Sequence, residues 1–75
     1  MPAFDFSKLR GRISEKCGSI RGLAAKSGIS EGKLYPSLQG HRAFRSSEIE
    51  RIIEPDCLDI PAEQISDYFF TLKVR

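Results

Sequence analysis

The side chains in this sequence that are best suited to bind a ligand are cationic, and most of them lie in its first part. Up to Arg45 the chain carries nine lysines and arginines against three acidic residues, whereas from Ser46 onward three basic residues face seven acidic ones. A basic front and an acidic rear form a dipole that orients a protein towards a polyanion. The alternative is that the two regions are simply solvated faces of opposite sign.

The sequence offers little for catalysis or for metal binding. A nucleophile such as Cys17 needs an organised base, and the only histidine, His41, lies in a polar stretch beside Arg42. Cys17 and Cys57 lack the close spacing of zinc ligands, and we expect both to be reduced. We therefore expect a protein that is not an enzyme, with no catalytic residue, no metal, no cofactor and no small-molecule substrate.

Length and composition favour one small globular domain. The chain has 75 residues, of which 40% are hydrophobic and 29% are charged, a balance typical of folded proteins. This length allows one core but no deep catalytic cleft. No run approaches the roughly 20 apolar residues of a membrane span, and residues 1–10 lack the apolar stretch of a signal peptide. We expect a single domain over residues 1–75, located in the cytoplasm and without membrane contact.

The first helix is predicted from the spacing of apolar residues. Phe6, Leu9, Ile13 and Cys17 recur at intervals of three and four, which places them on one face of a helix. Gly18 is expected to end this helix, because glycine adopts the left-handed conformation found after many helices.

Serines and glycines delimit the following helices. Ser19 and Gly28 bracket a second helix over residues 20–27, and Ser30 precedes a third that runs over residues 31–38. Each serine can cap the first turn with its hydroxyl oxygen.

The rest of the chain predicts two more helices and an irregular end. Either serine at 46–47 can cap a fourth helix, and with Ser47 as the cap Glu50 completes a capping box. Pro61 suits the first turn of a fifth helix. Residues 70–75 alternate apolar and polar side chains like a short strand, which would fold back, fray or pair with a second copy. The prediction is an all-α, compact bundle of about five short helices, with a C-terminal strand left open.

Residues 20–34 carry the pattern of a helix-turn-helix. Two short helices that cross closely need apolar anchors beneath them, a small residue at the crossing and a glycine at the corner. The positions that meet these needs are Leu23, Ala24, Gly28, Ile29 and Leu34.

Both ends of the chain add a resemblance to this motif. The opening FDFSKLRGRI (residues 4–13) and the close YFFT (residues 68–71) resemble those of small phage proteins classed as Cro repressors, within the Cro/repressor helix-turn-helix family. The resemblance covers nearly the whole chain. It implies a lambda-repressor-like fold and a sequence-specific regulator of phage or prophage transcription that binds double-stranded operator DNA at the bacterial nucleoid.

The resemblance also implies which residues contact DNA. In that family a recognition helix, here about residues 30–38, enters the major groove and its early residues meet base edges. The matching positions are Ser30, Glu31, Gly32, Lys33, Tyr35 and Pro36. Lys33 can donate to guanine, and Glu31 can accept from cytosine or merely favour the helix N-terminus. Phosphate contacts are expected from Ser19, Arg21, Gln39, His41, Arg42 and Arg45.

Three residues depart from the family pattern, and a fourth weakens the recognition helix. Ser27 stands where an apolar residue is usual, and Ile20 where a glutamine often touches phosphate. Pro36 removes the hydrogen bond to the Gly32 carbonyl, which typically costs about 3 kcal/mol inside a helix. Gly32 weakens the same helix by roughly 1 kcal/mol relative to alanine. We predict that the recognition helix is short, kinked, or held by tertiary packing.

These departures leave a second hypothesis open. With a degenerate recognition helix, the same fold would serve as a protein-binding antirepressor or an antitoxin-like module, and its acidic rear over residues 48–67 would suit a basic partner. On the DNA-binding hypothesis we expect a homodimer on a pseudo-palindromic site, formed through residues 68–74.

Overall fold

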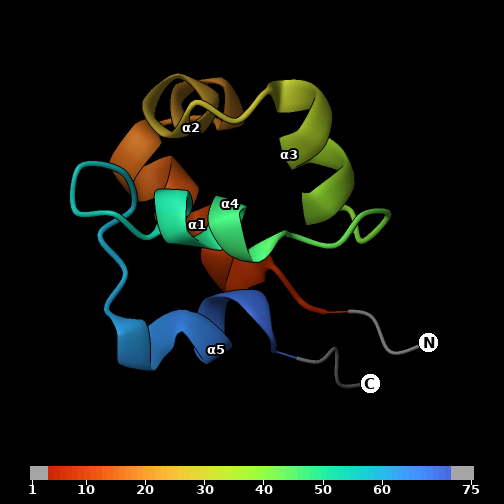
Figure 1. Cartoon of the computed structure of the whole chain (residues 1–75), viewed down its shortest axis with the longest axis vertical. Coiled ribbons are helices and arrows are strands. Elements are labelled where there is room, and N and C mark those ends of the chain that lie inside the picture. Colours follow the sequence, from red (N-terminus) through yellow and green to blue (C-terminus); the bar gives the residue numbers. More distant parts are fainter. Residues whose placement is uncertain (1–3, 72–75) are drawn as a thin grey trace.

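The computed structural model describes residues 4–71, in which five α-helices follow one another with short connections (Figure 1). They are α1 (Ser7–Cys17), α2 (Ile20–Ser27), α3 (Glu31–Leu38), α4 (Ser46–Ile52) and α5 (Ile65–Phe69). The described residues contain no strand element, so the predicted all-α fold is confirmed. None of these helices is long and apolar enough to cross a membrane. The strand predicted for residues 70–75 lies mostly outside the described residues.

Helices α2 and α3 have the predicted bounds and α1 ends at the predicted glycine, but the predicted cap by the Ser30 hydroxyl is wrong, because this hydroxyl accepts no hydrogen bond from α3. Gly18 follows α1 with a φ of 80°. The hydroxyl oxygen of Ser19 accepts a hydrogen bond from the Gly22 N–H at 3.1 Å, which caps α2. Gly28 ends α2 with a φ of 77°, in the left-handed region that favours glycine.

The start of α4 differs from the prediction. Arg45 is the residue before the helix, and α4 already begins at Ser46. The Arg45 N–H donates to Oε1 of Glu48 at 2.9 Å, so the carboxylate that satisfies the helix start is three residues after Arg45. The predicted capping box of Ser47 and Glu50 is therefore wrong. The reason lies in the tertiary structure, because the guanidinium of Arg42 also binds the Glu48 carboxylate and holds it on the buried side of the helix.

The fifth helix is shorter than predicted. A turn of 3₁₀ helix, Ala62–Gln64, follows Pro61, and α5 itself has five residues. Tyr68 and Phe69 are buried, and Ile65 packs against the core.

The core receives side chains from every helix and from the turn that follows α4. Buried residues of the helices include Leu9, Ile13, Leu23, Leu34, Leu38, Ile52 and Phe69. The turn contributes Cys57, Leu58 and Ile60, which the sequence analysis did not assign to the core because irregular segments show no periodicity. Burial raises the pKa of the Cys57 thiol to about 11, so this thiol is protonated at neutral pH and packs as a small apolar group.

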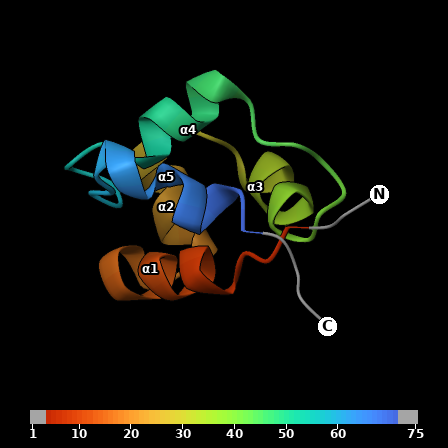
Figure 2. The same cartoon turned by 90° about the horizontal axis from the view of Figure 1, so that it is seen from below.

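The two ends of the described chain lie side by side, as Figure 2 shows. The Asp5 N–H donates to the Thr71 carbonyl at 2.6 Å. Aromatic rings surround this junction in edge-to-face pairs. The pairs are Phe4 with Phe70, Phe6 with Phe44, and Phe44 with Phe69, with centroids 5.3–5.6 Å apart.

Candidate functional site: the helix-turn-helix and the groove beside it

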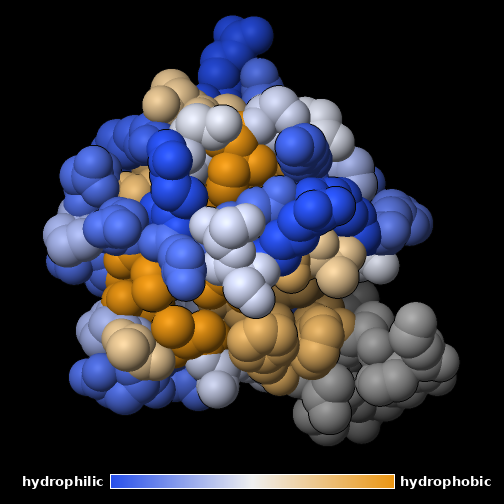
Figure 3. Space-filling model, viewed as in Figure 1, coloured by the Kyte–Doolittle hydropathy of each residue, from blue (hydrophilic) through white to orange (hydrophobic). Residues whose placement is uncertain are grey.

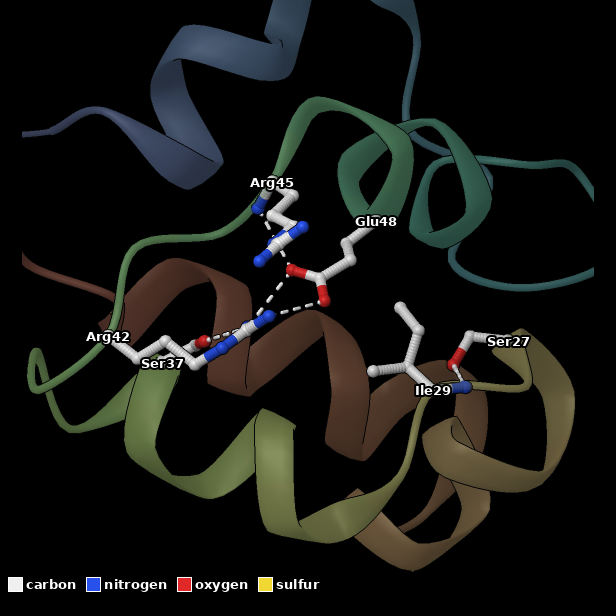
Figure 4. A network of polar contacts seen from close by, with 6 residues as sticks. All are labelled: Ser27, Ile29, Ser37, Arg42, Arg45 and Glu48. Carbon is white, nitrogen blue, oxygen red and sulfur yellow. Dashed lines mark hydrogen bonds and ion pairs between the residues drawn. The ribbon is translucent and has the colours of Figure 1, made fainter.

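Helices α2 and α3 form the predicted helix-turn-helix, joined through the turn at residues 28–30. They run in different directions in both views (Figures 1 and 2). Leu23, Ile29 and Leu34 are buried, as a helix-turn-helix requires. Ser27, the polar departure from the family pattern, is also buried, and its hydroxyl oxygen accepts the Ile29 N–H at 3.2 Å (Figure 4). This hydrogen bond explains why a serine is tolerated at the corner.

One glycine that the sequence analysis missed sets how closely α2 approaches α1. A Cβ atom built on Gly22 would lie 2.2 Å from the carbonyl oxygen of Cys17, a distance that real Cβ atoms do not show. The available signal was a glycine inside a predicted helix, which often marks close backbone approach.

Helix α3 continues through Pro36 over eight residues. Tertiary packing holds it, because Leu34, Ser37 and Leu38 on its inner side are all buried. The Pro36 carbonyl also accepts the His41 N–H at 2.8 Å beyond the helix end. Of the three predicted outcomes (a short helix, a kinked helix or a helix held by tertiary packing), the structure agrees with the last, because α3 spans the expected residues with a buried inner side.

The residues predicted to contact bases lie on or just before α3, and four of the six (Ser30, Glu31, Lys33 and Tyr35) carry a polar group on the side chain. Gly32 and Pro36 have no polar side chain, and Tyr35 is 45% exposed with its ring at the surface. Glu31 pairs with Arg21, one of the predicted phosphate ligands, across 3.7 Å. The Arg21 side chain is 87% exposed, so this ion pair is weak.

Arg42, a second predicted phosphate ligand, is engaged inside the protein. Its guanidinium donates to both carboxylate oxygens of Glu48, at 2.7 and 3.0 Å, and to the Ser37 hydroxyl at 2.9 Å (Figure 4). The hydrogen bond from Arg42 holds the pKa of Glu48 below its usual range. The pair joins the loop after α3 to α4, and the charge of Arg42 is neutralised there.

Other cations of the basic front also have structural partners. Arg10 donates to the Leu38 carbonyl at 3.2 Å, and Arg12 donates to two carbonyls of the turn after α4. Lys26 donates to the carbonyl of Lys16 at 3.1 Å. These hydrogen bonds to neutral carbonyls leave the charges in place but fix the positions of the three side chains.

A polar groove of about 770 Å³ lies between the turn at residues 28–30 and α4. It brings together four of the predicted contact residues, namely Ser30, Lys33, Arg42 and Arg45. Arg51, which the sequence analysis did not select, also lines it. The predicted phosphate ligands Ser19, Gln39 and His41 do not line this groove; all three are exposed. Within residues 4–71, no group of three or more histidine, cysteine or acidic residues could hold a metal ion.

The surface also carries exposed hydrophobic side chains. Among the described residues, the large ones are Phe4, Tyr35 and Phe70. In Figure 3, hydrophobic surface gathers in the lower half of the view, where Figure 1 places α5.

The chain is similar along its whole length to a phage protein of known structure. That structure is the solution structure of the modulator of repression of the temperate bacteriophage TP901-1 from Lactococcus lactis. The two share 32% sequence identity with a TM-score of 0.77, over 97% of this chain and 96% of the phage protein. The family described as "protein of unknown function (DUF739)" matches residues 2–72. The chain belongs to this family. A comparison with curated proteins finds no match.

Membership of the DUF739 family corrects the assignment made from the resemblance. The prediction of a Cro/repressor family member is wrong, because a different family matches and the similar structure is that of a modulator of repression. The same finding overturns the main functional prediction, a sequence-specific operator-binding regulator of Cro type. The resemblance misled because residues such as Leu23, Gly28 and Leu34 specify how two helices pack, and packing does not specify a ligand.

Proposed function

We propose that this protein modulates repression in a phage by binding a repressor protein, in the cytoplasm of the host cell. The observation that carries the proposal is its 32% identity, over 97% of the chain, to the modulator of repression of a temperate phage. A modulator has to change what a repressor does, and direct binding to the repressor is the simplest way to do so. This is the antirepressor hypothesis that the weakened recognition helix left open.

The chemistry of the helix-turn-helix surface supports a protein partner. Affinity for DNA depends on how many phosphates a protein neutralises with free cations. Arg42 is already paired with Glu48, and Arg21 lies beside Glu31. Side chains that meet a base edge need polar groups, which Gly32 and Pro36, two of the six predicted base-contact residues, lack.

The exposed aromatic residues of the protein are of the type that protein–protein interfaces bury. Aromatic side chains anchor protein interfaces more often than other types. Tyr35 projects from α3, while Phe4 and Phe70 form an exposed pair at the chain ends, with ring centroids 5.6 Å apart. Either surface offers apolar area that a partner can bury.

Binding to the repressor and to its operator can be compared directly. The purified chain is mixed with the repressor encoded in the same phage genome, and complexes are followed by size-exclusion chromatography with light scattering. The operator DNA is titrated separately with each protein at roughly 50 and 200 mM salt. We expect a complex of chain and repressor that reduces operator binding by the repressor, and only weak operator binding by the chain alone.

The opposite pattern rejects this function. In that pattern the chain forms no complex with the repressor and binds the operator by itself. Its affinity for the operator would then fall steeply as the salt concentration rises, because several phosphates are neutralised on binding.

Self-association is a separate proposal. Phe70 directly follows α5 and is exposed, and its ring packs against that of the exposed Phe4, so we propose that a second copy pairs there. Sedimentation velocity over a range of concentrations tests it, and a monomer at every concentration rejects it.

A further inference from the structure

We propose that the groove between the turn at residues 28–30 and α4 binds an acidic segment of polypeptide, whose carboxylates lie against Lys33, Arg45 and Arg51. The inference rests on the proposed function in one respect, because the segment belongs to a protein partner. It adds which surface is used and the chemistry of the segment that occupies it.

Three separate elements bring these cations to one groove. Lys33 comes from α3, Arg45 from the residue before α4, and Arg51 from the last turn of α4. All three residues are exposed, and none forms an ion pair with another residue of the described chain. Arg42 in the same groove differs, because Glu48 already neutralises it. The groove therefore has three cationic groups that form no direct ion pair within the described residues, although the charge of Lys33 contributes to the lowered pKa of Glu48.

Arg51 lines the groove beside the turn that joins α2 and α3. Its Nη2 atom would lie 3.0 Å from a Cβ atom built on Gly28, so the guanidinium rests against the corner of the helix-turn-helix. Ser30 and Ser47 line the groove near the cations and can donate or accept hydrogen bonds with a peptide backbone. A carboxylate that enters between these groups meets both a charge and hydroxyl donors.

The same groove contains carboxylates that disfavour a nucleic acid. Glu48 and Glu50 both line it, and a phosphate backbone presents negative charge continuously, so it cannot avoid them. A peptide can place carboxylates beside the cations and neutral residues beside Glu50. Charge complementarity therefore favours a peptide over a duplex.

The size of the groove suits a short segment. A volume of about 770 Å³ lies within the range of ordinary ligand sites, about 300–1,000 Å³. It accommodates a few residues of extended chain, such as a loop or a terminal tail of the partner.

The probes for the test are three short ligands. The first is a peptide of alternating glutamate and serine, the second replaces each glutamate with glutamine, and the third is a short DNA duplex of similar total charge. Each is titrated into the ¹⁵N-labelled chain, and backbone and arginine side-chain NMR signals are followed. We expect the glutamate peptide to shift signals of Ser30, Lys33 and Arg51, and the glutamine peptide to leave them unchanged.

Charge-removing variants locate the binding. Arg45→Gln and Arg51→Gln each remove one cation from the groove. Each should lower the affinity for the glutamate peptide by about two- to fivefold, the range of exposed ion pairs. Lys16→Gln removes the same charge from α1, away from the groove, and should bind the peptide like the wild type.

Each other outcome overturns the inference. No binding of the glutamate peptide rejects it, as does binding that Lys16→Gln weakens as much as the groove variants. Binding of the duplex alone at these residues assigns the groove to a nucleic acid instead. The repressor complex provides the separate readout: if it forms normally while the peptide fails to bind, the groove assignment is wrong and the proposed function stands. If the peptide binds and no repressor complex forms, the proposed function fails instead.

Discussion

A single carboxylate, that of Glu48, connects three parts of this molecule. It accepts the Arg45 N–H at the start of α4, and it pairs through two hydrogen bonds with Arg42 from the preceding loop. Arg42 in turn donates to the buried hydroxyl of Ser37 on α3. Because a buried polar group costs free energy unless it is hydrogen-bonded, these groups are stable only as a set. The network therefore fixes the loop at residues 39–45 against the helix-turn-helix.

This network predicts how stability depends on pH. The pKa of Glu48 is lowered in the folded protein, mainly by its hydrogen bond from Arg42. A lowered pKa means that the stabilisation is complete above the unfolded-state pKa of about 4.3 and is lost as pH falls through the folded-state value. Glu48→Gln should lower the free energy of unfolding at neutral pH and flatten its decline in acid, measured by urea denaturation at a series of pH values.

The matched control for this change is Glu50→Gln. It removes the same charge from an exposed position on the same helix and leaves the pair of Arg42 with Glu48 in place, so the decline in acid should persist. An equal flattening in both variants would show that general charge effects, and not this pair, cause the decline.

Among the helices, the contact of α1 with α2 depends on one missing side chain. Gly22 lies where α2 passes the end of α1, and a methyl group there would meet the Cys17 carbonyl oxygen. Neither partner can move easily, because both atoms belong to helix ends held by Gly18 and by the cap at Ser19. The orientation of the helix-turn-helix relative to α1 therefore depends on a backbone contact as well as on the core.

Two glycine substitutions test this contact. Gly22→Ala should destabilise the protein by roughly 1–3 kcal/mol, the usual cost of overpacking. Gly11→Ala, in α1 with no atom within 4 Å of its Cβ position, should stabilise the helix by about 0.5–1 kcal/mol. Thermal unfolding followed by circular dichroism measures both, and similar effects of the two substitutions would contradict the close approach.

On the scale of the whole molecule, Arg12 connects the first helix to the turn that closes the core. Its Nε donates to the Leu58 carbonyl at 2.8 Å and its Nη2 to the Asp59 carbonyl at 2.7 Å. These partners are 46 and 47 residues away along the chain. Asp59 adopts a positive φ of 51°, an unusual conformation outside glycine. The arginine stabilises this turn, which carries the buried Leu58 into the core.

Replacing the arginine tests this long-range link. Arg12→Lys keeps the charge but loses the forked donors that reach two carbonyls, so it should lower the free energy of unfolding by roughly 1–2 kcal/mol. Arg21→Lys changes an exposed arginine on α2 and should have almost no effect. Chemical denaturation compares the two, and equal stabilities would show that Arg12 contributes nothing specific.

Local patterns along the chain were enough to predict most of the helices. The spacing of Leu9 and Ile13, the cap at Ser19 and the glycines at 18 and 28 act within a few residues of one another, so their consequences can be derived without knowing the fold. The apolar anchors of the helix-turn-helix were predictable for the same reason. The functional class was not, because these residues describe packing and are shared by proteins with different ligands.

The sequence by itself determined the all-α architecture, the helix-turn-helix and an excess of positive charge in its first part. Only the tertiary structure decided where that charge is used. Arg12 and Arg42 are engaged by carbonyls and a carboxylate that lie near them only after folding, while Lys33, Arg45 and Arg51 meet at one groove. These contacts depend on the distances between helices that are far apart in the sequence, and such distances cannot be derived from the number of charges along the chain.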